Sequence, residues 1–125
     1  MEDIQIKAHF CYPACPAFDK YVADYAQAAN LSGADANIGP SLFSLFHAAG
    51  LRNVGFDVIQ PAASHGPGKQ MALITLDRIA CTLISYNIET QQSIGLLRQE
   101  LQQFTDDTQT IISLPRIFRV WGTKS

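Results

Sequence analysis

The sequence predicts a layered α/β domain with three strands and about four helices. The clearest observation is the stretch Ser41–Pro61, where apolar residues first recur at helical spacing and then alternate as in a strand. Gly50 stands between the two patterns and favours a helix end there, because glycine readily adopts the left-handed conformation. A second observation is the order of the patterns along the chain: strand, helix, helix, strand, two helices and strand.

The length and charge of the chain limit its number of domains and its possible partners. A chain of 125 residues is one domain or part of one, and the resemblance described below implies that residues 1–125 are a single partial domain. Its formal net charge is -2, and its nine basic residues are scattered among eleven acidic ones. Because nucleic-acid binding requires clustered positive charge, we expect no nucleic-acid partner.

The sequence also bears on the compartment. The first ten residues carry acids where a signal peptide needs a basic flank, and no uncharged apolar run approaches the roughly 18 residues of a membrane span. The three cysteines are an odd number and show no disulfide spacing. We therefore expect a cytoplasmic protein without membrane contact.

The N-terminal half contains one short strand and two helices. Met1–Ile6 alternates as the end of a strand, and the two prolines of Lys7–Pro16 indicate a loop. Apolar residues from Phe18 onward mark one face of a helix that ends near Gly33. A second helix is expected over Pro40–Ala49, since proline suits the first helical turn.

The C-terminal half begins with a strand over Val54–Gln60 and a glycine- and proline-rich loop at Ala62–Gly68. The next helix, Lys69–Asn87, is apolar almost all round, which predicts that it is covered on most sides. Thr90 is expected to cap a further helix that runs to Phe104.

The last strand follows a short turn at Thr105–Thr108. Apolar residues run from Ile111 to Trp121, but Pro115 has no backbone N–H to donate to a strand ladder. The strand proper is therefore predicted over Arg116–Gly122.

Two motifs suggest chemistry only weakly. Cys11, Cys15 and His9 have the side chains of a zinc site, but a C-x3-C without a second pair is more typical of small semi-buried residues. Gly66–Lys69 is similar to a phosphate-binding loop, yet Ala63 occupies the position of its first glycine. We expect no metal and read the second motif as a turn before a helix.

The first strand and the following loop hold the more interesting candidates. Glu2 and Asp3 are placed at a strand end, and ligands of open α/β sheets bind outside the carboxyl ends of strands. Adjacent strand residues point to opposite faces, so at most one addresses a given ligand, and two solvated carboxylates are the simpler alternative. Phe10 and Tyr12 are candidates for an apolar pocket wall, or for packing on the neighbouring helix.

Four stretches resemble the C-terminal half of class I S-adenosylmethionine-dependent methyltransferases. They are EDI at Glu2–Ile4, the Tyr12–Pro13 loop followed by AFDKYVADY, NIGPSLFSLFHAAGLRNVGFDVIQP at Asn37–Pro61, and SLPRIFRVWGTK at Ser113–Lys124. The stretches extend over nearly the whole chain. An Ala-Gly-Leu turn leading to a valine-rich strand is common in this family, and the final strand strengthens the likeness.

The resemblance implies a partial Rossmann-like methyltransferase sheet. Met1–Ile6 matches the end of the family's fifth strand, Val54–Gln60 the sixth, and Arg116–Gly122 the seventh, which runs antiparallel between the other two. The helices from Lys69 to Phe104 replace a connection that is usually short, and we interpret them as a lid or an added packing layer. The glycine-rich loop and the acidic residue that bind S-adenosylmethionine in the family have no counterpart here.

We therefore expect the substrate-side portion of a methyltransferase that acts on a small molecule and is inactive alone, because the half that binds S-adenosylmethionine is missing. The residues expected near the substrate are Glu2, Asp3, His9, Phe10 and Tyr12. A sheet cut at its fifth strand exposes an edge, which predicts a homodimer or a complex with a separate N-terminal half. The alternative is a non-enzymatic α/β binding or dimerisation module.

Overall fold

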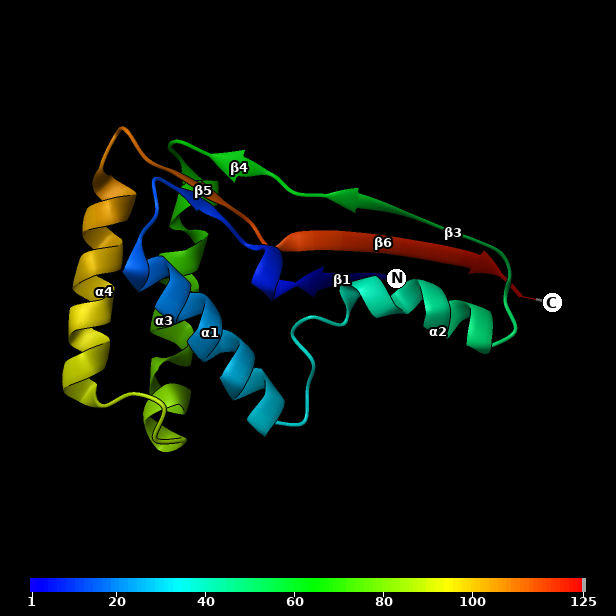
Figure 1. Ribbon diagram of the computed structural model, residues 1–125, viewed down its shortest axis with the longest axis horizontal. Helices are drawn as coiled ribbons and strands as arrows, with labels where there is room; N and C mark the ends of the chain where they lie inside the picture. The colour runs from blue at the N-terminus through cyan, green and yellow to red at the C-terminus, as the bar shows by residue number, and fades with distance from the viewer. Residues whose placement is uncertain (125) are drawn as a thin grey trace.

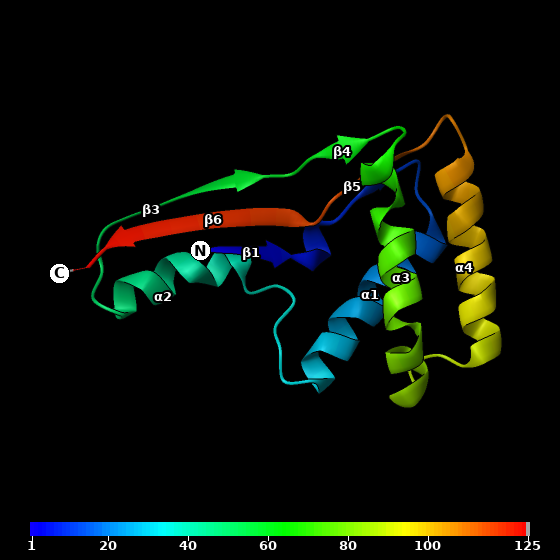
Figure 2. The same ribbon diagram turned by 180° about the vertical axis from the view of Figure 1, so that it is seen from behind.

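The chain folds into two three-stranded antiparallel sheets and four α-helices, as a computed structural model that describes residues 1–124 shows (Figure 1). Three helices form a group at one end of the molecule, and the fourth lies along the larger sheet at the other end (Figure 2). The expected mixed α/β class is confirmed.

The larger sheet contains the three predicted strands: β1 (Glu2–Gln5), β3 (Arg52–Ile59) and β6 (Arg116–Thr123). Their order is β1-β6-β3, and β6 pairs antiparallel with both neighbours. The prediction that the C-terminal strand lies antiparallel between the other two is therefore confirmed. Helix α2 (Leu42–Ala48) packs on one face, where the ring centroid of Phe43 lies 5.2 Å from that of Phe56.

The smaller sheet was not predicted. It consists of β2 (Cys11–Tyr12), β4 (Ala62–Ala63) and β5 (Ile111–Ser113) in the order β2-β5-β4. The two expected loops, Lys7–Pro16 and Ala62–Gly68, thus contain short strands, and the prediction was wrong at those residues. Strands of two or three residues carry too few side chains to show a period in the sequence.

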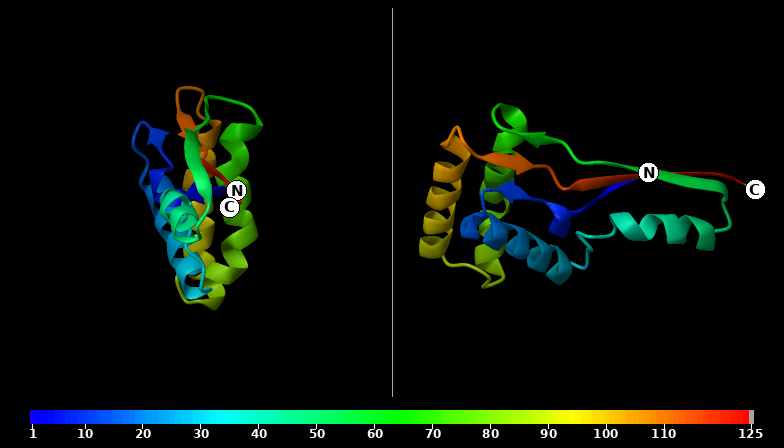
Figure 3. Two further views of the ribbon diagram at one scale, coloured as in Figure 1. Left: turned by 90° about the vertical axis from the view of Figure 1, so that its right-hand side faces the viewer. Right: turned by 45° about the horizontal axis from the view of Figure 1, so that its top comes forward.

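The same three segments of the chain form both sheets in succession, because β1 leads to β2, β3 to β4 and β5 to β6 (Figures 1 and 3). Prolines without a backbone N–H, Pro61 and Pro115, stand at two of the breaks. Gln60 bridges the gap with its side-chain amide, which donates to the carbonyl of Ala8 at 2.6 Å. Between β1 and β2 the strand is interrupted by the 3-10 turn η1 (Ile6–Ala8).

The three grouped helices are α1 (Pro16–Leu31), α3 (Pro67–Ser85) and α4 (Gln91–Asp106). They lie within a few residues of the predicted spans, and a further 3-10 turn, η2 (Gly39–Ser41), precedes α2. Within residues 1–124, no helix combines the length and the hydropathy that crossing a bilayer would require.

The main core lies between α1, α3 and α4. Its fully buried large side chains include Phe18, Tyr21, Leu76, Leu83 and Leu101. Helix α3 was expected to be covered on most sides, but α1 and α4 leave its outer face open. Met71, Ile74 and Ile84 of α3 remain exposed. The expectation was wrong for this face, because apolar composition does not specify how many neighbours a helix receives.

Thr90 caps α4, as predicted. Its Oγ1 accepts a hydrogen bond from the backbone N–H of Ser93 at 3.0 Å, and Ser93 Oγ accepts one from the backbone N–H of Thr90 at 2.7 Å. We expect Thr90→Ala to lower the free energy of unfolding by about 1 kcal/mol, because the backbone N–H of Ser93 loses its partner. Urea denaturation measures this change, with Thr108→Ala on an exposed turn as the control. Equal losses in both variants would contradict the capping role.

Candidate functional site: the hollow around Tyr25

Three adjoining cavities surround Tyr25, where α1, α3 and β1 meet, and we call them together the Tyr25 hollow. Their volumes are about 200, 110 and 520 Å³, and Tyr25 lines all three. Ile4 is shared by the second and third cavities, and Ala29 by the first and third. A single partly buried tyrosine therefore stands at the centre of a larger, divided space.

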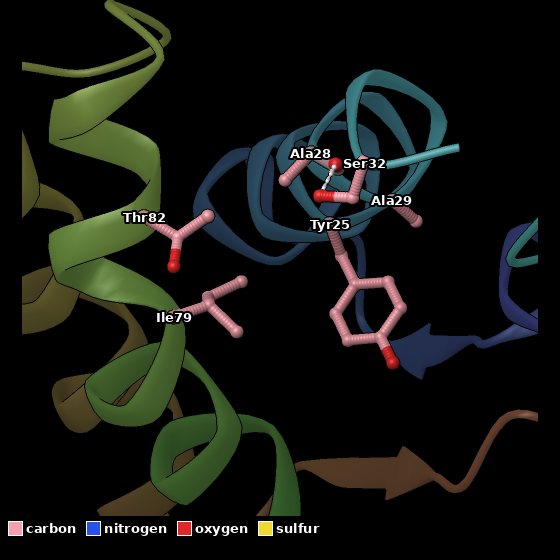
Figure 4. A pocket seen from close by; sticks show the side chains of 6 residues that line it. All are labelled: Tyr25, Ala28, Ala29, Ser32, Ile79 and Thr82. Carbon is pink, nitrogen blue, oxygen red and sulfur yellow. Dashed lines mark hydrogen bonds between the residues drawn. The ribbon is translucent and has the colours of Figure 1, made fainter. Parts of the chain in front are cut away.

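The first cavity lies between α1 and α3 (Figure 4). Ala28 and Ala29 leave room on α1, while Ile79 and Thr82 project from α3 toward them. Ser32 Oγ donates to the carbonyl of Ala28 at 3.0 Å, so one polar group of the wall is already satisfied. The cavity is mainly apolar and suits a hydrocarbon or aromatic group.

The second cavity contains His9, whose side chain is 8% exposed. The imidazole packs edge-on against Phe18, with ring centroids 4.8 Å apart, and neither ring nitrogen has a hydrogen-bond partner. Burial lowers the pKa of His9 to about 4, and a weaker interaction with the backbone of Ser113 opposes this. The ring is therefore neutral at pH 7, with one nitrogen able to donate and the other able to accept.

Tyr21 is the second titratable group of this cavity. Burial raises its pKa to about 12, while a hydrogen bond with Thr75 acts in the opposite direction. Its phenol therefore keeps its proton at neutral pH. The second cavity is thus lined by neutral polar groups and apolar walls, an environment that disfavours a charged ligand.

The third cavity is the largest and lies beside the start of β1 and the connection after α1. It is lined by Asp3 and by residues 33–36 and 38. Asp3 Oδ1 accepts a hydrogen bond from the backbone N–H of Ile4 at 2.8 Å. This cavity supplies the acidic end of the hollow.

The structure brings only two of the five predicted substrate residues to the hollow, Asp3 and His9, and places them in different cavities. Glu2 is exposed, and it lies opposite Arg119 in the register of β1 and β6. Phe10 and Tyr12 are 42% and 69% exposed and line none of the three cavities. The aromatic wall comes instead from Tyr21 and Tyr25 of α1.

The position of the two carboxylates in the strand also differs from the prediction. Glu2 and Asp3 begin β1 and do not end it. The carboxyl end of β1 is Gln5, and the chain continues from there through Ile6 to His9. The second cavity therefore adjoins the carboxyl end of this strand.

Sequence reasoning placed Tyr21 and Tyr25 on the apolar face of a helix and did not identify them as site residues. Their spacing of four positions gives them the same face of α1. That spacing is equally typical of a core stripe, so the sequence contains no signal that separates the two roles. Thr75 shows no signal either, because its contact with Tyr21 joins two distant segments.

No metal site is formed by the residues that the structure describes. Within residues 1–124, no three His, Cys, Asp or Glu side chains lie close enough to hold an ion. Burial and the neighbouring Cys15 raise the pKa of Cys11 to about 11, so its thiol is protonated at pH 7. His9 packs against aromatic rings, so we interpret His9, Cys11 and Cys15 as packing residues.

The motif Gly66–Lys69, similar in sequence to a phosphate-binding loop, forms the start of α3. Gly66 is the N-cap of that helix, and its φ of 84° is a conformation that favours glycine. The adjoining Lys69 is 2% exposed, and its Nζ donates to the backbone carbonyl of Asp107 at 2.8 Å. That lysine tethers the end of α4 and is not free to meet a ligand.

A separate polar cluster lies on the other side of α1. Lys20 Nζ contacts Asp24 Oδ1 at 2.7 Å and Glu89 Oε2 at 2.6 Å, so one ammonium bridges two buried carboxylates. Burial and a hydrogen bond that protonated Asp24 donates to Glu89 raise the pKa of Asp24 to about 6, with Lys20 acting in the opposite direction. Because Lys20 contacts carboxylates from both segments, we read this cluster as a tie between α1 and the start of α4.

Comparison with known proteins gives no independent assignment. No protein-family model matches the chain, and no curated protein matches it.

Proposed function

We propose that this chain is the C-terminal, substrate-side portion of an S-adenosylmethionine-dependent methyltransferase that acts on a small molecule. The single observation that carries the proposal is the strand order β1-β6-β3, in which β6 runs antiparallel between the other two. The resemblance of the sequence to class I methyltransferases implies this order for the family's fifth, seventh and sixth strands. On this reading the sheet is one part of a Rossmann-like fold.

The Tyr25 hollow supports the role of this portion. It adjoins the carboxyl end of β1 and is lined by α1 and α3, so one of the two inserted helices, α3, forms part of the wall of the place where an acceptor would bind. Methyl transfer depends chiefly on positioning, since the donor is already activated. The proposed task of His9, Tyr25 and Asp3 is to bind and orient the acceptor.

The cofactor site is proposed to lie on other polypeptide. Within residues 1–124, β1 pairs with no strand other than β6, although the N–H of Ile4 at its other edge is already bonded to Asp3 Oδ1. An exposed strand edge readily pairs with a further strand. We propose a separate N-terminal half, or a second copy of the chain, as the partner.

The cysteines Cys11, Cys15 and Cys81 are free thiols, which favours a cytoplasmic location.

Calorimetric titration of the 125-residue chain with S-adenosylmethionine tests this division. We expect no binding in the micromolar range, because the cofactor site is proposed to lie on other polypeptide. Micromolar binding would contradict the proposal that other polypeptide supplies that site. The genomic DNA before the Met1 codon gives a second test. A glycine-rich strand and loop encoded there, in the same or a shifted frame, would support the enzyme.

A non-enzymatic α/β binding or dimerisation module is the second candidate. The observation that favours it is the exposure of large apolar side chains on β3 and β6, where Phe56 is 49% and Trp121 50% exposed. Such side chains are typical of contact surfaces. A dimer seen by light scattering on a sizing column, together with unrelated upstream DNA, would favour the module.

A further inference from the structure

We propose that the second cavity of the Tyr25 hollow binds an uncharged hydroxyl compound with an apolar body, such as a phenol, and that His9 hydrogen-bonds its hydroxyl group. The geometry behind this proposal is a buried imidazole without a partner in a cavity of apolar walls. That the ligand is the methyl acceptor rests on the function proposed above, whereas the binding itself does not.

The first observation behind the proposal is the unpaired imidazole of His9. His9 is 92% buried by its exposed fraction of 8%, and both its Nδ1 and its Nε2 lack a hydrogen-bond partner. Buried polar atoms are normally paired, because an unpaired one costs about 1–3 kcal/mol. A ligand that supplies the missing partner removes this cost, so the cavity is selective for a group that can donate or accept.

The charge of the ligand follows from its neighbours. Besides His9, the titratable side chains that line the second cavity are the phenols of Tyr21 and Tyr25. The cavity contains no carboxylate or ammonium, and a neutral imidazole cannot balance a charged group. An anion or a cation would therefore be desolvated without compensation, while a neutral hydroxyl would not.

The size and shape of the cavities favour a ring or a short chain. The second cavity has a volume of about 110 Å³, and an apolar cavity of about 150 Å³ is known to bind benzene. The aliphatic side chains of Met71, Ala72 and Leu114 line this cavity, so it suits a single small ring or a short chain.

The test compares phenol with toluene, which have the same number of heavy atoms but differ in the hydroxyl group. We expect the full chain to bind phenol about three- to tenfold more tightly than toluene, the range that one hydrogen bond gives. In His9→Phe, which keeps a planar ring, this preference should disappear while toluene binding is retained. His65→Asn, on an exposed loop, should leave both affinities unchanged.

A measurement on the unaltered chain keeps the proposal falsifiable if His9→Phe fails to fold. The chain has three histidines, so the ring-nitrogen NMR signals can be assigned with His47→Asn and His65→Asn. Phenol should shift the His9 signals, and toluene should not. Equal affinities for the two probes, unmoved His9 signals with phenol, or no binding of phenol at millimolar concentration would each overturn the proposal. These experiments need no S-adenosylmethionine, so their failure is separate from a failure of the proposed function.

Discussion

Lys20→Met should lower the free energy of unfolding by about 2–3 kcal/mol at pH 7. The side chains of Asp24 and Glu89 are only 2% and 6% exposed, and the single ammonium of Lys20 pairs with both. Its removal leaves two buried carboxylates side by side without a cation. The loss stays below that of a fully buried pair, because 51% of the Lys20 side chain is already in water. Urea denaturation measures the difference, and Lys7→Met at an exposed position is the control.

The pH dependence identifies the cause of this loss. The pKa of Asp24 is raised to about 6, so its contribution to stability is complete at low pH and is lost as pH rises through that value. Burial opposes the ionisation of Glu89, but hydrogen bonds with Asp24, Lys20 and Ser93 lower its pKa overall, so its contribution is lost as pH falls. Without Lys20, the pKa of one of the two carboxyl groups rises, and that group shares its proton with the other.

We therefore expect the destabilisation by Lys20→Met to be clearly smaller at pH 5 than at pH 7. The double variant Lys20→Met/Asp24→Asn should recover at least half of the loss at pH 7, because a single carboxylate remains. Equal losses at the two pH values, with no recovery in the double variant, would show that the methylene stem of Lys20 matters more than its charge.

Leu101→Ala should destabilise the chain by about 2–5 kcal/mol. Leu101 is fully buried in the core between α1, α3 and α4, where its removal leaves a cavity that rigid helices fill only in part. Thermal and urea denaturation measure the loss. Leu96→Ala on the same helix is the matched control, since Leu96 is 57% exposed and its truncation should cost at most about 0.5 kcal/mol. Similar losses in the two variants would mean that α4 is not docked as described.

Most of the helices and long strands were predictable, because their signals are local. The 3.6-residue period of α1, the cap at Thr90 and the helix end at Gly50 each depend on residues within one or two turns. Pro115 likewise fixed the start of β6 at Arg116, because a residue without an N–H cannot join the ladder. The central place of β6 came from the resemblance to a family and not from periodicity.

The candidate site was predictable only in part. Asp3 and His9 were chosen as site residues for their chemistry and their place beside a strand, and both line the hollow. Glu2 was chosen on the same grounds, and its place beside Asp3 in a strand sends it to the other face. Phe10 and Tyr12 remain exposed, and neither lines one of the three cavities.

The sequence by itself determined where the chain forms helices and its three long strands, because periodicity, capping residues and proline act over a few residues. Only the tertiary structure decided that His9 is buried without a partner, that Lys20 and Asp24 meet Glu89, and that short strands form a second sheet. These features join segments separated by tens of residues. Burial, desolvation and strand pairing depend on which segments meet, and a local pattern does not specify that.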